Sequence, residues 1–446
     1  MKDKKADIIV VGAGCAGLVA AIQARELHQK VIVLEKMAQA GGNSMRASSG
    51  MNAAETIPQL KAGVIDDWHA FYAETLKGGG YLNDPSLLEY FASHSALAID
   101  WLAAHGIILD DLTITGGMSV KRTHRPHSMA PVGAFLIKHL LKRAQELDIP
   151  VICQTKVQKL LQKDDRIVGV ATNQGEFKAK AVILATGGFG ASPALIQKYR
   201  PDLASFKTTN HQGATGDGLK LGLEIGAQLT QMELIQVHPT VNQDTDHAYL
   251  IGEAVRGEGA ILVNQQGMRF VNELATRKVV SAAITALPEK SAYLLFDDQV
   301  KNRVKAIDFY QQKGLVKQAE SIDSLAEMLK MDTAELASTV KRWNQMATAK
   351  KDRAFQRTTG LKVLSKKPYY AIHVAPAIHY TMGGLHINDK AEVFDQNGEI
   401  IGGLYACGEV CGGLHGNNRI GGNSIAETVI FGRQAGLQAV CNRERS

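Results

Sequence analysis

The stretch DIIVVGAGCAG, residues 7–17, decides the fold of this chain. It begins with a continuous apolar run, 8–11, of the kind that forms a buried parallel strand. It continues with the spacing G-x-G-x-x-G at Gly12, Gly14 and Gly17 and leads into an Ala-rich helical pattern. The first glycine permits a tight turn, the second lets a pyrophosphate approach the backbone, and the third lets the helix pack on the strand.

The sequence around this turn strengthens the prediction of a dinucleotide site. A second apolar run, 31–34, ends in Glu35, where an acidic residue holds ribose hydroxyls. The phosphates would lie at the N-terminus of the first helix, where unpaired N–H groups and the helix dipole favour anions. Two later strands, 181–185 and 403–406, also run into Gly-rich turns. We therefore expect an α/β fold, with a doubly wound Rossmann-like domain built from distant segments.

The length and pattern of the chain predict a second domain. A chain of 446 residues is long for a single core. The segment 289–350 is helical in pattern and more charged. We expect an inserted α+β capping domain at 238–370, which interrupts a first domain made of 1–237 and 371–446. No Pro- or Ser-rich linker separates the parts, which favours insertion over tandem fusion.

Composition limits the partners. The net charge of +6 is mild and no long Lys/Arg block occurs, so we expect no nucleic-acid partner and instead a preference for anionic substrates. No apolar stretch reaches about 18 residues without a charge, so no membrane span is expected. No signal peptide precedes the first strand, which predicts a cytoplasmic location. The five scattered cysteines predict no disulfide framework, Cys407 and Cys411 are expected to be small core residues, and no metal site is expected.

Four features favour FAD over NAD as the dinucleotide. The segment 41–44 (GGNS) offers small residues where a flavin and its ribityl chain would pass, and 185–188 (ATGG) closes a later strand. Glu409 ends another strand and suits ribityl hydroxyls. The segment 421–424 (GGNS) opens an apolar helix whose N-terminus would stabilise an anionic reduced flavin. The residues expected to contact FAD are Gly12, Gly14, Ala16, Gly17, Glu35, Lys36, Gly42, Asn43, Ser44, Ser49, Gly50, Met51, Val157, Ala185, Thr186, Gly187, Asp217, Glu409, Arg419, Ser424 and Ile425.

Eight segments follow one another across nearly the whole chain. They are GGNSMRASSGMNAA (41–54), GGMSVKRTHRP (116–126), TNHQGATGDGL (209–219), HPT (238–240), EAVRGEGAILVN (253–264), RFVNELATR (269–277), HYTMGG (379–384) and HGNNRIGGNS (415–424). In these motifs the chain resembles the flavoprotein subunits of the fumarate reductase/succinate dehydrogenase family, above all the flavin part of soluble flavocytochrome c fumarate reductases. The resemblance implies an FAD domain interrupted by a capping domain, with the substrate between them, and reduction of the C=C bond of a small unsaturated carboxylate, with fumarate as first choice.

The resemblance also implies roles for individual residues. These are Arg277 as proton donor, Glu253 and Arg256 as a proton relay to it, and His238, His379 and Arg419 as carboxylate clamps. Flavin N5 would supply the hydride. Arginine is an unusual acid because its pKa lies above about 12, but a cationic cluster and a relay carboxylate can replenish its proton. Cationic groups also stabilise the enolate-like charge of the transition state.

Departures from the family pattern leave alternatives open. Close fumarate reductases have Thr where this chain has Gly252, and Tyr380 stands where a second His can occur. The lost hydroxyl and the added space make another 2-enoate, of the urocanate, cinnamate or methacrylate type, an alternative substrate. An oxidase of the aspartate oxidase kind and a non-enzymatic flavin-binding sensor are further alternatives. A steroid dehydrogenase is disfavoured, because the clamp of histidines and arginines suits a carboxylate.

The sequence also allows predictions about how FAD is attached and where the electrons come from. Asn43 stands where membrane-bound relatives carry the histidine that tethers FAD, so we expect noncovalent FAD. No CxxCH haem-binding segment occurs in the sequence. The electron donor is therefore expected to be another protein or a free reduced flavin, and the sequence does not distinguish them.

Overall fold

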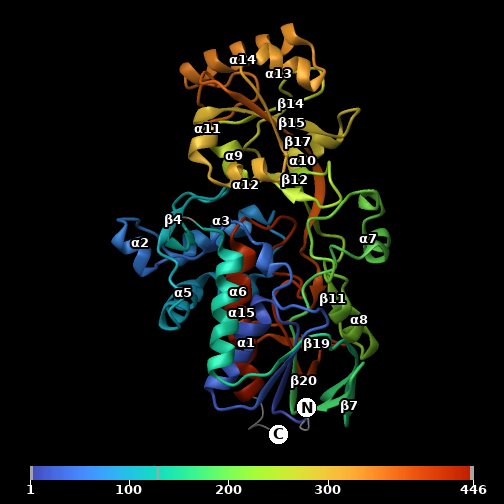
Figure 1. The fold of residues 1–446 in the computed structure, drawn as a ribbon. Helices are drawn as coiled ribbons and strands as arrows, with labels where there is room; N and C mark the ends of the chain where they lie inside the picture. The colour runs from blue at the N-terminus through green and yellow to red at the C-terminus, as the bar shows by residue number, and fades with distance from the viewer. Residues whose placement is uncertain (1–3, 128–129, 442–446) are drawn as a thin grey trace. The chain divides into compact units, whose positions relative to one another are not determined.

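The computed structural model describes residues 4–127 and 130–441 and divides the chain into two compact units (Figure 1). The first unit comprises Met1–Ala204, Asn210–Gln236 and Tyr380–Ser446, and the second comprises Ser205–Thr209 and Val237–His379. The chain therefore leaves the first unit and returns to it, as an inserted domain requires.

The return point differs from the expected one at residue 371. Strand β17 (Tyr369–Thr381) pairs antiparallel with β15 (Ala292–Asp297), with Ala371 opposite Leu295. Because this pairing holds the first part of β17 in the sheet of the second unit, residues 371–379 belong there rather than to the first unit.

A nine-stranded sheet forms the centre of the first unit, in the order β6-β2-β1-β10-β20-β8-β7, with β19 beside β20 and β9 beside β8. Its strands are β1 (Ile8–Val11), β2 (Val31–Leu34), β6 (Val151–Ile152), β7 (Val157–Lys163), β8 (Arg166–Thr172), β9 (Gly175–Lys178), β10 (Ala181–Leu184), β19 (Glu392–Phe394) and β20 (Ile400–Ala406). Neighbours from β6 to β8 pair in parallel. Every residue of β1, β2 and β10 is buried, as continuous apolar runs predict for central parallel strands. The prediction of an α/β fold with a parallel sheet is confirmed.

Three long helices accompany this sheet (Figure 1): α1 (Cys15–Glu26), α6 (Val132–Glu146) and α15 (Asn423–Cys441). The backbones of α1 and α15 lie in close contact. A Cβ on Gly432 would lie 2.8 Å from the Ala16 carbonyl oxygen, and one on Gly436 would lie 2.5 Å from that of Ala20. Glycine at these two positions of α15 therefore allows the two helices to pack closely.

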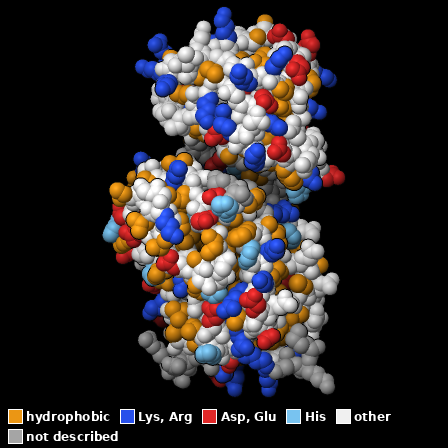
Figure 2. Space-filling model, turned by 60° about the vertical axis from the view of Figure 1, so that its left-hand side comes forward, with side chains coloured by type: hydrophobic (Ala, Val, Ile, Leu, Met, Phe, Trp, Pro, Cys, Tyr) orange, Lys and Arg blue, Asp and Glu red, His pale blue; other side chains and the backbone are white. Residues whose placement is uncertain are grey.

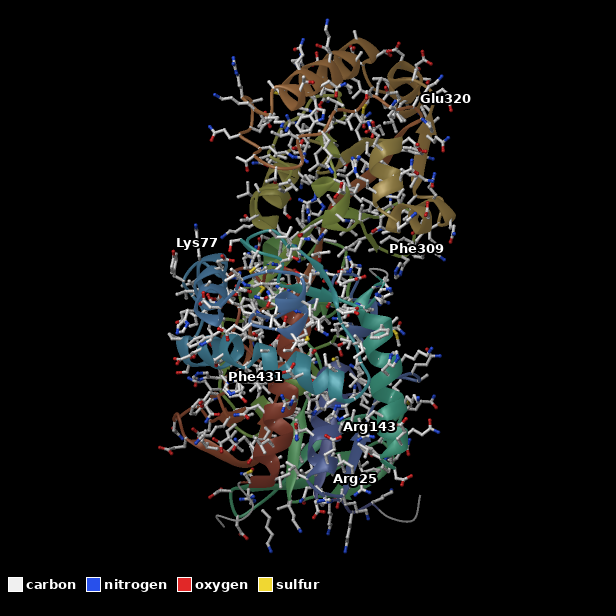
Figure 3. The ribbon with its side chains drawn as sticks, turned by 90° about the vertical axis from the view of Figure 1, so that its left-hand side faces the viewer. Arg25, Lys77, Arg143, Phe309, Glu320 and Phe431 are labelled. Carbon is white, nitrogen blue, oxygen red and sulfur yellow. The ribbon has the colours of Figure 1, made fainter. Side chains whose placement is uncertain are left out.

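The ends of α1 and α6 are tied together by polar contacts. Arg25 donates from Nε to the carbonyl of Leu147 at 2.9 Å, and Arg143 donates to Glu26 Oε1 at 3.0 Å (Figure 3). The other elements of the first unit are η1 (Ser44–Arg46), β3 (Met51–Asn52), α2 (Ile57–Lys61), α3 (Trp68–Gly78), α4 (Pro85–Ser93), α5 (Ser95–Ala104), β4 (Asp111–Thr113), β5 (Thr123–Arg125), α7 (Pro193–Tyr199), η3 (Pro201–Leu203), α8 (Asp217–Glu224), β11 (Leu229–Thr230) and β18 (Gly384–Leu385).

A six-stranded sheet and six helices make the second unit. The sheet has the order β13-β12-β17-β15-β14, with β16 beside β17. Its further strands are β12 (Ile235–Asn242), β13 (Tyr249–Leu250), β14 (Ile261–Val263) and β16 (Val316–Ala319), and its helices are α9 (Glu253–Gly257), α10 (Arg277–Thr285), α11 (Asp298–Arg303), α12 (Ala306–Gln312), α13 (Ile322–Leu329) and α14 (Thr333–Thr348). The core of this unit includes the fully buried side chains of Trp343 and Phe296. Strands and helices together confirm the expected α+β character.

On the face shown in Figure 2, lysine and arginine side chains are spread among acidic ones rather than gathered in one block. Within residues 4–127 and 130–441, no helix is both long enough and apolar enough to span a membrane.

Candidate active site

The glycine turn after β1 is built as its spacing predicts. Gly12 has φ +107°, and a Cβ there would lie 2.3 Å from the carbonyl oxygen of Ala185. A Cβ on Gly17 would lie 2.0 Å from the carbonyl oxygen of Gly12. Gly14 differs, because it is the N-cap of α1 and a Cβ there would meet nothing closer than Ser44 Oγ at 3.6 Å. The backbone is therefore open at Gly14, where a ligand phosphate would approach the helix N-terminus.

Glu35 lies beside this turn at the end of β2. Its Oε2 accepts from the N–H of Ala13 at 2.9 Å, and its Oε1 accepts from the N–H of Met37 at 2.8 Å. These two contacts fix the carboxylate next to the helix N-terminus, in the position that suits a ribose.

A second polar group lies at the end of β20. Glu409 Oε1 accepts from the N–H of Thr381 at 3.1 Å, and Asn43 Nδ2 donates to Oε2 at 3.4 Å. Burial raises the pKa of Glu409 to about 7. The buried Oγ1 of Thr186 has no hydrogen-bond partner in the part of the chain that the structure describes. A buried carboxylate and an unsatisfied hydroxyl fit the hydroxylated chain of FAD.

The other expected FAD contacts also belong to the first unit. Ser44 Oγ accepts from the N–H of Cys15 at 3.2 Å, and Lys36 forms an ion pair with Asp217 at 3.0 Å. Burial raises the pKa of Asp217, but hydrogen bonds from Thr215 and Lys36 outweigh it and hold the pKa below its usual value. Most of the remaining ones are buried small or apolar positions: Ala16, Gly50, Met51, Val157, Ala185 and Ile425. Gly42, Ser49, Gly187 and Ser424 are partly exposed.

Sequence reasoning missed several neighbours of these groups. Asn210 Oδ1 accepts from Asn43 Nδ2 at 2.6 Å, and Thr215 Oγ1 accepts from Lys36 Nζ at 2.7 Å. Both residues lie in the segment 209–219, so the motif contained the signal although no role was assigned to them.

In the second unit, the structure brings the three expected catalytic residues together. Arg277, the first residue of α10, donates from Nε to Glu253 Oε1 at 2.6 Å. Arg256 lies one turn after Glu253 on α9, with Nη2 3.8 Å from the same oxygen. Arg256 is only 2% exposed and donates from Nη1 to the carbonyl of Glu273 at 2.6 Å. Burial lowers the pKa of Arg256.

The two expected histidines are also neighbours within the second unit. The rings of His238 and His379 lie 5.4 Å apart, edge to face. His238 Nδ1 accepts from the N–H of Thr240 at 3.3 Å, so the neutral ring carries its proton on Nε2. His379 Nδ1 lies 2.8 Å from Thr209 Oγ1. Each imidazole is thus oriented through its Nδ1.

Arg419 belongs to the first unit and is 4% exposed. It donates from Nη2 to Gln236 Oε1 at 3.0 Å and from Nη1 to Ser424 Oγ at 3.3 Å. The guanidinium is thus buried and held by two acceptors, and its planar fork of N–H donors is of the kind that pairs with carboxylates.

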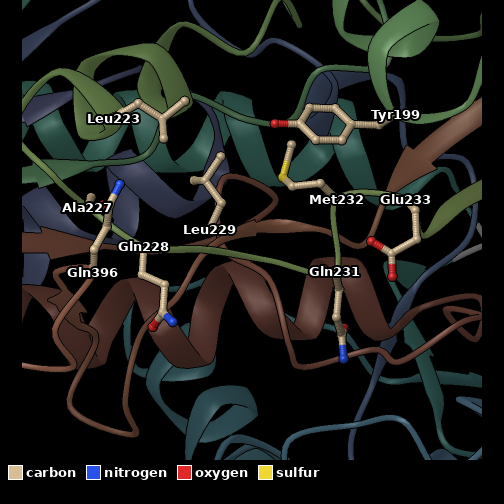
Figure 4. A pocket seen from close by; sticks show the side chains of 9 residues that line it. All are labelled: Tyr199, Leu223, Ala227, Gln228, Leu229, Gln231, Met232, Glu233 and Gln396. Atoms are coloured by element: carbon tan, nitrogen blue, oxygen red, sulfur yellow. The ribbon is translucent and has the colours of Figure 1, made fainter.

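A surface pocket of about 430 Å³ in the first unit is a separate feature (Figure 4). Tyr199, Gln396 and side chains from 223–233 line it, and none of the expected FAD or substrate residues does. The candidate active site is therefore not this pocket.

The glycine turn, the two placed carboxylates and the parallel sheet fit a dinucleotide-binding flavoprotein of the FAD type, and the second unit adds two buried or partly buried arginines that share a carboxylate. Comparisons with known proteins agree. A family model described as FAD binding domain matches residues 7–425. The NADH:fumarate oxidoreductase of Klebsiella pneumoniae (strain 342) is 48% identical over 442 residues, which cover 98% of this chain and 48% of that protein.

This chain covers a larger share of two further relatives. The fumarate reductase (cytochrome) of Shewanella frigidimarina is 43% identical over 439 residues, which cover 97% of this chain and 76% of that one. The solved open conformation of a flavocytochrome c3 fumarate reductase superposes with a TM-score of 0.86 at 41% identity, over 98% of this chain and 78% of that one. This chain therefore belongs to the FAD-dependent fumarate reductase family of flavoprotein oxidoreductases. It spans about half the length of the Klebsiella relative.

Proposed function

We propose that this protein reduces the C=C bond of a small unsaturated carboxylate, with fumarate converted to succinate. The observation that carries the proposal is the contact of Arg277 with Glu253, beside buried Arg256. When bound, FAD would supply a hydride to one carbon of the substrate, and the protein would have to supply a proton to the other. The names of the Klebsiella and Shewanella relatives point to the same substrate.

Arg277 is the proposed proton donor. Its Nε already donates to Glu253, so a proton given to the substrate carbon is replaced through a hydrogen bond that exists before the reaction. Glu253 is about one-third exposed at its side chain, which allows it to take up the replacement proton from solvent. Burial lowers the pKa of Arg256. The positive charge of Arg256 favours loss of a proton from Arg277.

His238, His379 and Arg419 are the proposed carboxylate ligands. Each histidine is oriented by a hydrogen bond or ring contact, and Arg419 is held by Gln236 and Ser424. Positive charge and N–H donors on the carboxylate stabilise the enolate-like charge that develops after hydride transfer.

Gly252 bears on which acid is the substrate. A Cβ at Gly252 would meet only Tyr310 Oη, at 3.7 Å, so there is room for a larger residue or a larger substrate. The alternative substrates are 2-enoates of the urocanate, cinnamate or methacrylate type. The alternative activity is an amino-acid oxidase of the aspartate oxidase kind.

The test is anaerobic reoxidation of the reduced enzyme, followed at the flavin absorbance band. We expect rapid reoxidation by fumarate. Faster reoxidation by urocanate, cinnamate or methacrylate would change the substrate and keep the mechanism. Failure with all four acids, together with peroxide formation from L-aspartate in air, would replace the reductase with an oxidase. The variant Gly252→Thr is expected to narrow the range of accepted acids towards fumarate.

We further propose that FAD is held noncovalently and that the electron donor is another protein or a free reduced flavin. Asn43, at the position of the tethering histidine, supports the first proposal, because its amide is no nucleophile and is engaged with Asn210. Acid denaturation should release the yellow chromophore into the supernatant; colour retained in the pellet would contradict this. The cytoplasmic location stays a prediction.

A further inference from the structure

Arg419 lies over the face of an aromatic ring. Its Cζ is 4.7 Å from the ring centroid of Tyr380, and the two side chains are 4% and 6% exposed. A guanidinium is attracted to the face of such a ring and stacks flat on it, and the attraction is strongest where water is excluded. The ring therefore limits the tilt of the guanidinium, while Gln236 and Ser424 accept from its nitrogens.

Tyr380 is itself held by a buried carboxylate. Its phenol donates to Glu427 Oε2 at 2.6 Å, and His415 Nε2 lies 3.0 Å from the same oxygen. Burial and the neighbouring carboxylate raise the pKa of Tyr380 well above its usual value, so the phenol keeps its proton and remains a donor. Glu427 is 2% exposed and His415 is 3% exposed. The tyrosine ring thus has one fixed orientation, which two buried side chains enforce.

The same arrangement bears on the charge of Arg419. A buried cation is costly unless a negative charge lies near it. Glu427 is a buried carboxylate of α15. Tyr380 links it to Arg419, because the tyrosine hydroxyl donates to Glu427 and the tyrosine ring lies against the guanidinium of Arg419. Loss of the phenol hydroxyl would remove a donor from Glu427, and loss of the ring would remove the surface on which Arg419 lies.

We propose that Tyr380 is a positioning residue that holds Arg419 in the plane needed to bind a substrate carboxylate, and that Glu427 and His415 hold Tyr380. This inference rests on the proposed function, because it gives Arg419 the task of binding the acid. It adds three residues to which no role in this site was assigned from the sequence motifs.

The experiment measures the dissociation constant of succinate from the oxidised holoenzyme, by flavin difference absorbance, together with kcat and KM for fumarate. Tyr380→Phe keeps the ring and loses the hydrogen bond, and we expect succinate to bind about fivefold more weakly. Tyr380→Leu loses both, and we expect a weakening of about 30-fold. In both variants KM for fumarate should rise by a larger factor than kcat falls, because hydride and proton donors are untouched.

Tyr370→Phe is the matched control. The phenol of Tyr370 donates to Asp298 Oδ1 at 3.1 Å in the second unit and is 3% exposed, so the change removes a similar bond elsewhere. We expect its succinate affinity to stay within about twofold of wild type. Melting temperature and FAD content are measured on every variant, and Tyr380→Phe serves if Tyr380→Leu does not fold.

The outcomes separate this inference from the proposed function. Wild-type enzyme that neither binds succinate nor reduces fumarate would overturn the proposed conversion of fumarate to succinate and, with it, the task given to Arg419 in binding that acid. Wild-type enzyme that does both, with folded Tyr380 variants that match it in succinate affinity and KM, would overturn the positioning role alone. A graded loss from Tyr380→Phe to Tyr380→Leu, with no loss in Tyr370→Phe, is the expected result.

Discussion

Arg277 Nε donates to Glu253 Oε1 at 2.6 Å, and this contact joins the first residues of two helices, α10 and α9. Because each residue is the first of its helix, the backbones of two different helices hold the pair in place. Lysine cannot replace Arg277 fully, since an ammonium has one nitrogen, whereas the guanidinium can donate to Glu253 through Nε and still carry two further nitrogens. We expect Arg277→Lys to lower the rate of fumarate reduction by prereduced enzyme by a factor of about 10³, measured by stopped-flow absorbance.

A second pair in the same unit supplies the control. Arg303 Nε lies 2.8 Å from Glu258 Oε2, in an ion pair that is about one-third exposed. We expect Arg303→Lys to leave the rate within about twofold, because exposed pairs contribute little. A rate for Arg277→Lys above one-tenth of wild type would remove Arg277 from the role of proton donor.

The glycine turn allows FAD binding to be separated from folding. Alanine at Gly17 would place Cβ 2.0 Å from the Gly12 carbonyl oxygen, so we expect Gly17→Ala to destabilise the apoprotein itself. Alanine at Gly14 would meet only Ser44 Oγ at 3.6 Å, in an ordinary extended backbone conformation. We expect Gly14→Ala to keep the apoprotein melting temperature within about 2 °C and to weaken FAD binding at least about tenfold, by titration of apoprotein with FAD. Equal FAD affinity in Gly14→Ala and wild type would show that no phosphate approaches this backbone.

The elevated pKa of Glu409, about 7, predicts a pH dependence of apoprotein stability. Between its ordinary value of 4.5 and 7, the folded state binds a proton that the unfolded state has lost. The free energy of unfolding should therefore fall as pH rises through this window, by at most about 3 kcal/mol, and stay level above it. Glu409→Gln carries no such proton and should flatten the slope, measured by urea denaturation between about pH 5 and 8. The exposed Glu176→Gln is the control, and an unchanged slope in Glu409→Gln would show that the pH dependence has its origin in another group.

The sequence predicted local features well and long-range ones poorly. The turn at Gly12, Gly14 and Gly17 was predictable because strand, turn and helix are consecutive, and each glycine has a separate steric reason. The end of the inserted unit was not predictable, because residues 371–374 are held there by pairing with β15, which lies about 80 residues earlier in the sequence. Arg256 taken alone resembles a surface charge, and only its contacts in the folded unit explain its burial.

The contacts of Tyr380 in the site could not be predicted from the sequence either. Tyr380 was recognised only as a departure from a histidine. Its partners, Arg419 and Glu427, are 39 and 47 residues away in sequence, and no spacing rule connects them. Motifs identify residues that bind a ligand, whereas the side chains that orient those residues depend on the packing of the whole unit.

Glu273 gives the last prediction, on the stability of the second unit. It is fully buried, and its oxygens accept from Arg269 Nε at 2.7 Å and from Arg357 Nη1 at 3.0 Å. Glutamine would leave two guanidiniums without their shared counter-charge, so we expect Glu273→Gln to lower the free energy of unfolding by about 3–5 kcal/mol. The control is Glu335→Gln, whose partner Arg342 is half exposed, and which should change that free energy by less than about 1 kcal/mol. Urea denaturation of both variants measures the difference. Equal stability would mean that water or a rearranged acceptor satisfies the two guanidiniums.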